Sequence, residues 1–82
     1  MLVSLKEVYR SGINFKTRDL VINTEFVVSI TKSNTSSVLV EGKAEPTECS
    51  LITLSGGEKY AILGTIENVK KKIYGGAKLL NG

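Results

Sequence analysis

The sequence contains no histidine and no tryptophan, and it has one cysteine and one proline among 82 residues. The absence of histidine excludes Ser-His-Asp and Cys-His catalysis and the ordinary zinc sites. The single cysteine, Cys49, cannot form an internal disulfide or hold an iron–sulfur cluster, and we interpret it as a small buried or half-buried thiol. The acids Glu41, Glu45 and Glu48 lie in a polar stretch where little burial is expected to tune them. We therefore expect no enzyme, no catalytic residue, no metal site and no cofactor.

Long apolar runs are also missing. No run approaches the ~18 residues that a membrane-spanning helix needs. Residues 1–7 have no basic n-region and reach a charge at Lys6, so we expect no secretory signal. A hydrophobic fraction of 41% and a charged fraction of 23% are ordinary for a globular domain. The sequence thus predicts one small cytoplasmic domain over residues 1–82, without membrane contact, with an ordered core over 1–76 and a flexible tail over 77–82.

Short runs of β-branched and aliphatic residues recur along most of the chain. They predict strands over residues 2–10, 20–22, 26–31, 51–54 and 59–63. Residues 13–17 are left open between strand and loop, and residues 38–40 read as a strand stub. The turn signals are Asn23-Thr24-Glu25 and the Gly56-Gly57 pair, which is typical of a hairpin. We expect residues 32–37 to form a polar loop and residues 41–50 to form an acidic exposed loop.

A helical pattern replaces the strand patterns near the end of the chain. Ile66, Val69 and Ile73 recur at the spacing of one helix face. Thr65 is a suitable N-cap, and Gly75-Gly76 is a suitable stop. The sequence therefore predicts an α+β fold, with a small antiparallel β-sheet of four to six short strands and one C-terminal helix.

One stretch of the chain carries a pattern that extends beyond single elements. Its parts are the turn at Asn23, the hairpin around Gly56-Gly57, and the cap and stripe of the helix at Thr65, Val69 and Ile73. Over residues 20–73 this layout resembles the flagellar FlbD family of small bacterial proteins, and similar small bacterial and phage proteins. The resemblance implies a small, non-enzymatic accessory or regulatory protein of a bacterium or phage.

The positive charge is gathered in two segments, and the net charge is +3. The candidate nucleic-acid-binding residues in these segments are Lys6, Arg10, Lys16, Arg18, Lys70, Lys71 and Lys72. Such cations neutralise phosphates, and neighbouring aromatic side chains can stack on bases. Helix-dipole compensation and solubility explain the helix lysines equally well. A nucleic-acid-binding regulator with a basic face is therefore the alternative function.

Self-association or a protein partner is the first hypothesis. In the run 26–31, Val27 falls on the face opposite Phe26, Val28 and Ile30, so we expect both sheet faces to be partly apolar. Exposed sheet edges and a second apolar face favour association. The predicted contact residues, where exposed, are Tyr9, Phe15 and Val27. The sequence thus predicts a small regulatory or interaction protein that acts by protein–protein docking or homo-oligomerisation.

Overall fold

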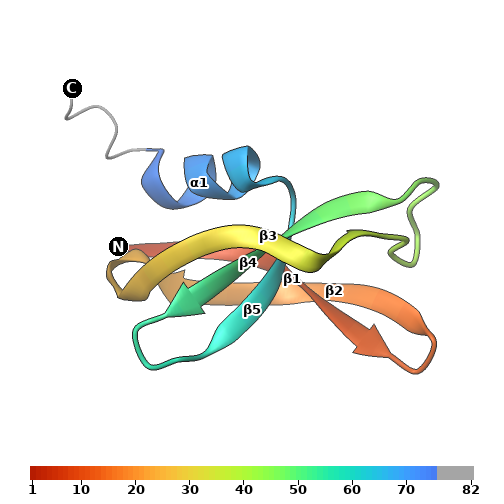
Figure 1. Ribbon diagram of the computed structural model, residues 1–82, viewed down its shortest axis with the longest axis horizontal. Helices are drawn as coiled ribbons and strands as arrows, with labels where there is room; N and C mark the ends of the chain where they lie inside the picture. Colours follow the sequence, from red (N-terminus) through yellow and green to blue (C-terminus); the bar gives the residue numbers. More distant parts are fainter. Residues whose placement is uncertain (76–82) are drawn as a thin grey trace.

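The computed structural model describes residues 1–75, without the side chains of residues 34–37. Its elements are β1 (Leu2–Ser11), β2 (Asn14–Asn23), the 3₁₀ helix η1 (Thr24–Phe26), β3 (Val27–Val38), β4 (Thr47–Leu54), β5 (Lys59–Leu63) and α1 (Ile66–Tyr74). The strands form one antiparallel five-stranded sheet in the order β2-β1-β5-β4-β3 (Figure 1). The predicted α+β fold with a small sheet and a C-terminal helix is therefore confirmed.

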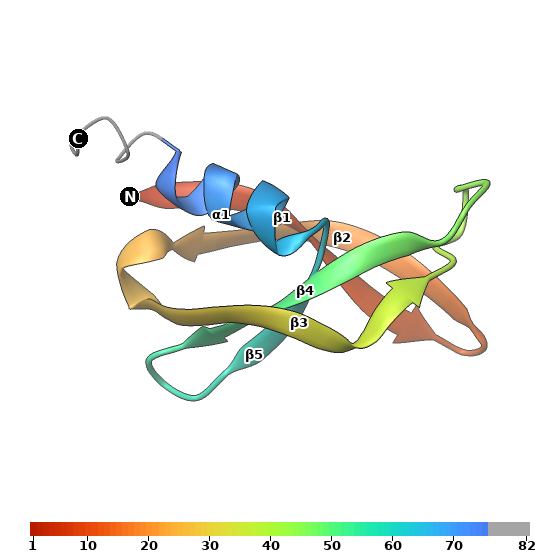
Figure 2. The ribbon, with the colours of Figure 1, turned by 45° about the horizontal axis from the view of Figure 1, so that its top comes forward.

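The sheet is strongly twisted, and its two edge strands are linked at both ends (Figures 1 and 2). At one end η1 joins β2 to β3. At the other end a parallel bridge pairs Phe15 of β2 with Val40, and the Glu41 N–H donates to the Phe15 carbonyl at 2.8 Å. The sheet therefore has two edges that approach each other, and α1 lies over one face between them.

The main core lies between α1 and the face of the sheet that it covers. Along each strand every second side chain points to this face, and the helix stripe meets those side chains. The buried members are Leu5, Ile22, Ile52, Ile62, Val69 and Ile73, none more than 6% exposed. The spacing that predicted the helix is thus the spacing that docks it.

A second, smaller cluster lies on the opposite face. Glu7 pairs with Ile62, so Val8 and Leu63, one residue further along their strands, point away from α1. The buried members of this cluster are Val8, Val38, Val40 and Cys49. Both faces of the sheet are partly apolar, as predicted, but Val27 does not contribute to the second face. A register shift between Val27 and Ser29 turns both Val27 and Ile30 toward the main core, so the prediction that Val27 faces away from Ile30 was wrong.

The strands are longer than the sequence predicts, and two loop assignments are wrong in part or in full. Residues 14–17, which the sequence left open between strand and loop, and residues 20–22 are parts of one strand, β2, which pairs with β1 along its whole length, whereas Ile13 lies in the turn before it. Residues 32–37 are a continuation of β3 rather than a loop. Residues 47–50 belong to β4, where Cys49 and Ser50 are 4% and 0% exposed, so the prediction of an exposed loop over 41–50 was wrong for these four. Pairing with neighbouring strands makes extended structure favourable for Ser and Thr residues whose local signal is polar. The predicted flexible tail, 77–82, lies outside the described residues.

Helix α1 begins and docks as predicted. The Thr65 side chain accepts a hydrogen bond from the Asn68 N–H at 3.1 Å, and Lys71 and Lys72 occupy the last turn. Gly64 precedes the cap with φ +126°, a conformation that side chains disfavour. Along residues 1–75, no helix is long and apolar enough to cross a bilayer.

Candidate functional site

The four predicted nucleic-acid-binding cations of the β1–β2 hairpin are divided between the two faces of the sheet. Lys16 and Arg18 pair with Tyr9 and Glu7, whose side chains share the face of Leu5. Lys6 and Arg10 lie one residue out of phase and therefore point to the opposite face. The hairpin does not bring these four cations together on one surface.

Each of these cations also has a local partner. Three are in ion pairs, Lys6–Asp19, Arg18–Glu7 at 2.9 Å and Lys16–Glu41 at 3.8 Å, and the Arg10 guanidinium lies 5.9 Å from the Phe15 ring centroid. The hydrogen bond from Arg18 to Glu7 raises the pKa of the guanidinium further, so Arg18 stays charged. Exposed ion pairs contribute only about 0–1 kcal/mol each, but they neutralise charge that phosphates would need.

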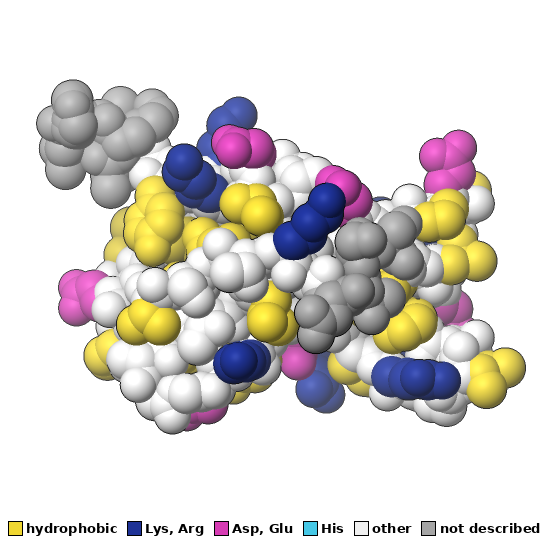
Figure 3. Space-filling model, in the orientation of Figure 1, with side chains coloured by type: hydrophobic (Ala, Val, Ile, Leu, Met, Phe, Trp, Pro, Cys, Tyr) yellow, Lys and Arg dark blue, Asp and Glu magenta, His cyan; other side chains and the backbone are white. Residues whose placement is uncertain are grey.

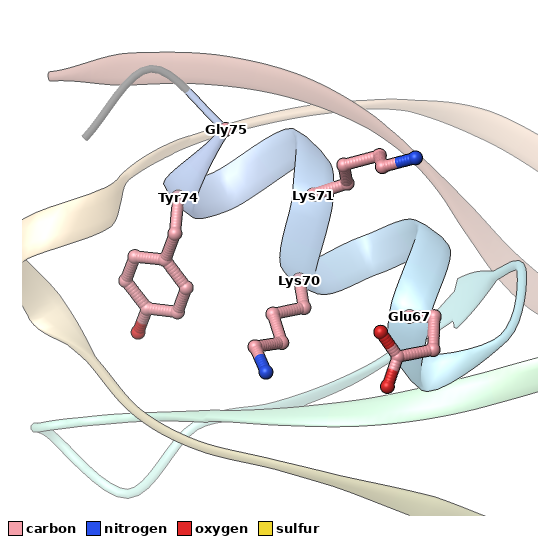
Figure 4. A pocket seen from close by; sticks show the side chains of 5 residues that line it. All are labelled: Glu67, Lys70, Lys71, Tyr74 and Gly75. Atoms are coloured by element: carbon pink, nitrogen blue, oxygen red, sulfur yellow. The ribbon is translucent and has the colours of Figure 1, made fainter. Parts of the chain in front are cut away.

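The remaining predicted cations, Lys70, Lys71 and Lys72, lie on the exposed side of α1. Figure 4 shows Lys70 beside Glu67 and Tyr74 on one side of the helix, whereas Lys71 points to another. These side chains line a shallow hollow of about 160 Å³. Lys71 and Lys72 line a different hollow near the start of the helix. The helix lysines thus point in different directions, as the 100° step between successive helical residues requires.

The predicted contact residues are each half-buried within the chain. Tyr9 lies under the Arg18 guanidinium, 4.3 Å from the ring centroid. Phe15 packs on the second cluster, and Val27 packs on the main core. Contacts within the chain therefore cover much of the surface of these three side chains. Other residues expose more apolar surface.

Exposed apolar side chains gather at one end of the molecule. The exposed large hydrophobic residues in the described part of the chain are Met1, Leu2, Ile13, Val21, Phe26, Val28, Leu39 and Tyr74. Most of them belong to the end where the chain starts, β2 runs into η1, β3 begins and α1 stops (Figure 1). Figure 3 shows hydrophobic side chains on the surface at this end, and others at the opposite end. We call Met1, Leu2, Val21, Phe26, Val28 and Tyr74 the apolar end.

The two edges of the sheet differ in charge. Edge strand β2 carries Lys16, Arg18 and Asp19, and the bridge to Val40 occupies its first residues. Edge strand β3 begins without a charge, and residues 26–31 hold only apolar, Ser and Thr side chains. We call residues 26–31 the neutral edge. Natural sheets usually protect an edge with charge, proline or a covering segment, so an exposed neutral edge is a candidate pairing site.

Sequence reasoning missed that Phe26 and Val28 carry the exposed apolar surface, at 54% and 62% exposure. A strict alternation along 26–31 assigns Val28 to the same face as Ile30. The register shift leaves Val28 without a partner on β4. No local signal in the sequence marks that shift, because it depends on how β3 pairs with β4.

Cys49 is 4% exposed, and burial raises the pKa of its thiol above the ordinary value of 9.0. Among the described residues, no group of three or more His, Cys, Asp or Glu side chains is close enough to hold a metal ion.

The raised pKa of Cys49 predicts a pH dependence of stability. Well below pH 9.0 the thiol is neutral in both states and its packing contributes fully. Above that pH the unfolded thiol loses its proton while the folded thiol keeps it, so the free energy of unfolding should fall. Urea denaturation of the wild type and of Cys49→Ala across this pH range should show their difference in stability shrinking as pH rises. Parallel pH profiles for the two proteins would contradict the prediction.

No protein-family model, no curated protein and no solved structure matches the chain. The resemblance to the FlbD family stays a prediction, and the functional argument depends on the chain's own surface.

Proposed function

We propose that this chain is a small, non-enzymatic regulatory or interaction protein of a bacterium or phage, which works in the cytoplasm by docking to protein. The docking surface is the neutral edge of β3 together with the apolar end. The observation that carries the proposal is the exposure of Phe26 and Val28 where edge strand β3 begins, in a segment without charge up to Lys32.

Two kinds of contact are available on this surface. The backbone of an edge strand offers unpaired N–H and C=O groups, to which a strand of a partner can add. The neighbouring apolar side chains supply burial, at roughly 25 cal/mol per Å² of apolar surface removed from water. The backbone groups thus orient a partner strand, and the side chains supply most of the affinity.

The alternative, a nucleic-acid-binding regulator, depends on Lys6, Arg10, Lys16, Arg18 and the helix lysines acting together. The hairpin cations are divided between two faces, and three of them are ion-paired with acids. Binding a phosphate chain would require these pairs to be broken or shared. Docking to protein is therefore the function that the surface supports better.

Photo-crosslinking in the cells that produce the protein tests the proposal. Phe26 is replaced by the photoreactive residue benzoylphenylalanine, which keeps an aromatic ring at the position. The control is the same replacement at Ile13, which is 89% exposed but lies at the turn between β1 and β2, at the other end of the sheet. We expect polypeptide adducts from position 26 and few from position 13. Equal adducts from both positions, or none from position 26, would overturn the proposal.

A further inference from the structure

We infer that the partner strand at the neutral edge is the β3 strand of a second copy of this chain, paired antiparallel across a two-fold axis. This inference rests on the proposed docking function and names its partner. The resulting dimer joins the two sheets into one through the strands that begin at Val27.

The charges that bound the neutral edge determine the direction of pairing. Glu25 precedes the edge; its carboxylate lies 4.0 Å from the N-terminal ammonium of Met1, and its side chain is 77% exposed. Lys32 follows the edge and is also exposed. When two copies of this segment lie antiparallel, Glu25 of each copy comes to the end that carries Lys32 of the other. A parallel arrangement would place like charges together.

This pattern also indicates why a second copy suits the edge. A segment with an acid at one end, a base at the other and no charge between is complementary to itself when reversed. A two-fold axis repeats every contact, so the two copies form two Glu25–Lys32 pairs of opposite charge at once. An unrelated strand would need the reverse charge order to match this edge equally well.

The outer side of β3 is not paired with another strand in the described part of the chain. β3 has a hydrogen-bonded neighbour on one side only, which is β4. Ser29 and Thr31 are exposed, and Val28, unpaired on β4, is 62% exposed. In the dimer Phe26 and Val28 of both copies lie at the new seam and remove apolar surface from water.

The edge strand β2 is a poorer seam. It carries three charged residues, Lys16, Arg18 and Asp19, whereas Lys32 is the one charged residue of β3, and the bridge between Phe15 and Val40 covers one end of β2. Charges within an edge strand are a common protection against pairing.

Charge exchange tests the inference, with the molecular mass in solution measured by light scattering. We expect the wild type to be a dimer. Glu25→Lys and Lys32→Glu should each weaken self-association on the order of tenfold, because residues 25 and 32 of opposite copies would then carry like charges. Mixing the two variants should restore a dimer, because residues 25 and 32 of opposite copies carry opposite charges in the mixed pair. The double variant Glu25→Lys with Lys32→Glu should dimerise by itself.

The control is Lys43→Glu, which makes the same charge change as Lys32→Glu on an exposed residue between β3 and β4. Its mass should equal that of the wild type. The double variant keeps the test decisive if either single variant fails to fold, because it retains the net charge of the wild type.

Three results would overturn the inference. They are a monomeric wild type, single variants that remain as dimeric as the wild type, and a mixture and a double variant that both stay monomeric. A monomeric wild type whose position 26 crosslinks to another polypeptide would overturn the dimer and leave the docking function standing. Failure of crosslinking at position 26 would remove both.

Discussion

Ile52→Ala is expected to lower the free energy of unfolding by about 2–5 kcal/mol, the usual cost of emptying a buried aliphatic site. Ile52 is 0% exposed and lies in β4, whose two neighbours are β3 and β5. It pairs with Ile30 on one side and Tyr60 on the other, and it packs in the cluster that contains Ile73 of α1. The cavity would therefore weaken packing both within the sheet and between the sheet and the helix.

Urea denaturation followed by circular dichroism measures this loss. Val21→Ala is the matched control, because Val21 is 60% exposed on an edge strand and should change stability by no more than about 0.5 kcal/mol. Small domains have only about 5–15 kcal/mol in total, so Ile52→Ala should move the midpoint of urea unfolding far below that of the wild type. A loss at Ile52 no larger than that at Val21 would show that the main core is not centred on β4.

Gly64→Ala is expected to cost about 1–3 kcal/mol, the range for a residue forced into a disfavoured backbone conformation. Gly64 has φ +126°, which lies outside even the left-handed helical region that other residues occasionally adopt. An added Cβ would make ordinary van der Waals contact, 3.4 Å from the Asn68 Cβ, so the expected cost is conformational. The backbone cannot shift freely, because the Gly64 N–H donates to the Glu48 carbonyl at 2.8 Å and its carbonyl accepts from the Ser50 hydroxyl at 2.9 Å.

Thermal unfolding of Gly64→Ala and of the control Gly12→Ala compares the stability losses at two glycines that both have positive φ. Gly12 has φ +65°, within the left-handed helical region, and an added Cβ would meet nothing within 4 Å. Its substitution should cost about 1 kcal/mol. The larger loss should fall at Gly64, because this residue joins β5 to the cap of α1 and so determines where the helix docks. Equal losses at the two glycines would contradict this role.

The docking surface depends on two features that belong to different levels of structure. The lack of charge between Glu25 and Lys32 is a property of the sequence. The position of that segment on an edge is a property of the strand order, in which β3 is last. An uncharged strand in the middle of the sheet would have both sides paired and would offer nothing to a partner.

Sequence by itself determined the features that depend on near neighbours along the chain. The stripe of Ile66, Val69 and Ile73, the Thr65 cap and the Gly56-Gly57 turn each involve residues a few positions apart, and all are found where they were predicted. These elements suffice for the α+β class. The exclusion of histidine-dependent catalysis and of an internal disulfide likewise follows from composition alone.

Only the tertiary structure decided which strands pair and which face each side chain takes. Residues 32–37 continue β3 and residues 47–50 begin β4 because each supplies the other with backbone partners, although both segments are locally polar. The same pairing contains the register shift that turns Val27 toward the main core and leaves Val28 exposed. The β1–β2 register separates Lys16 and Arg18 from Lys6 and Arg10. A strand's side-chain period is two, so a shift of a single residue, set by distant partners, reverses which side chains reach the core and which reach the surface.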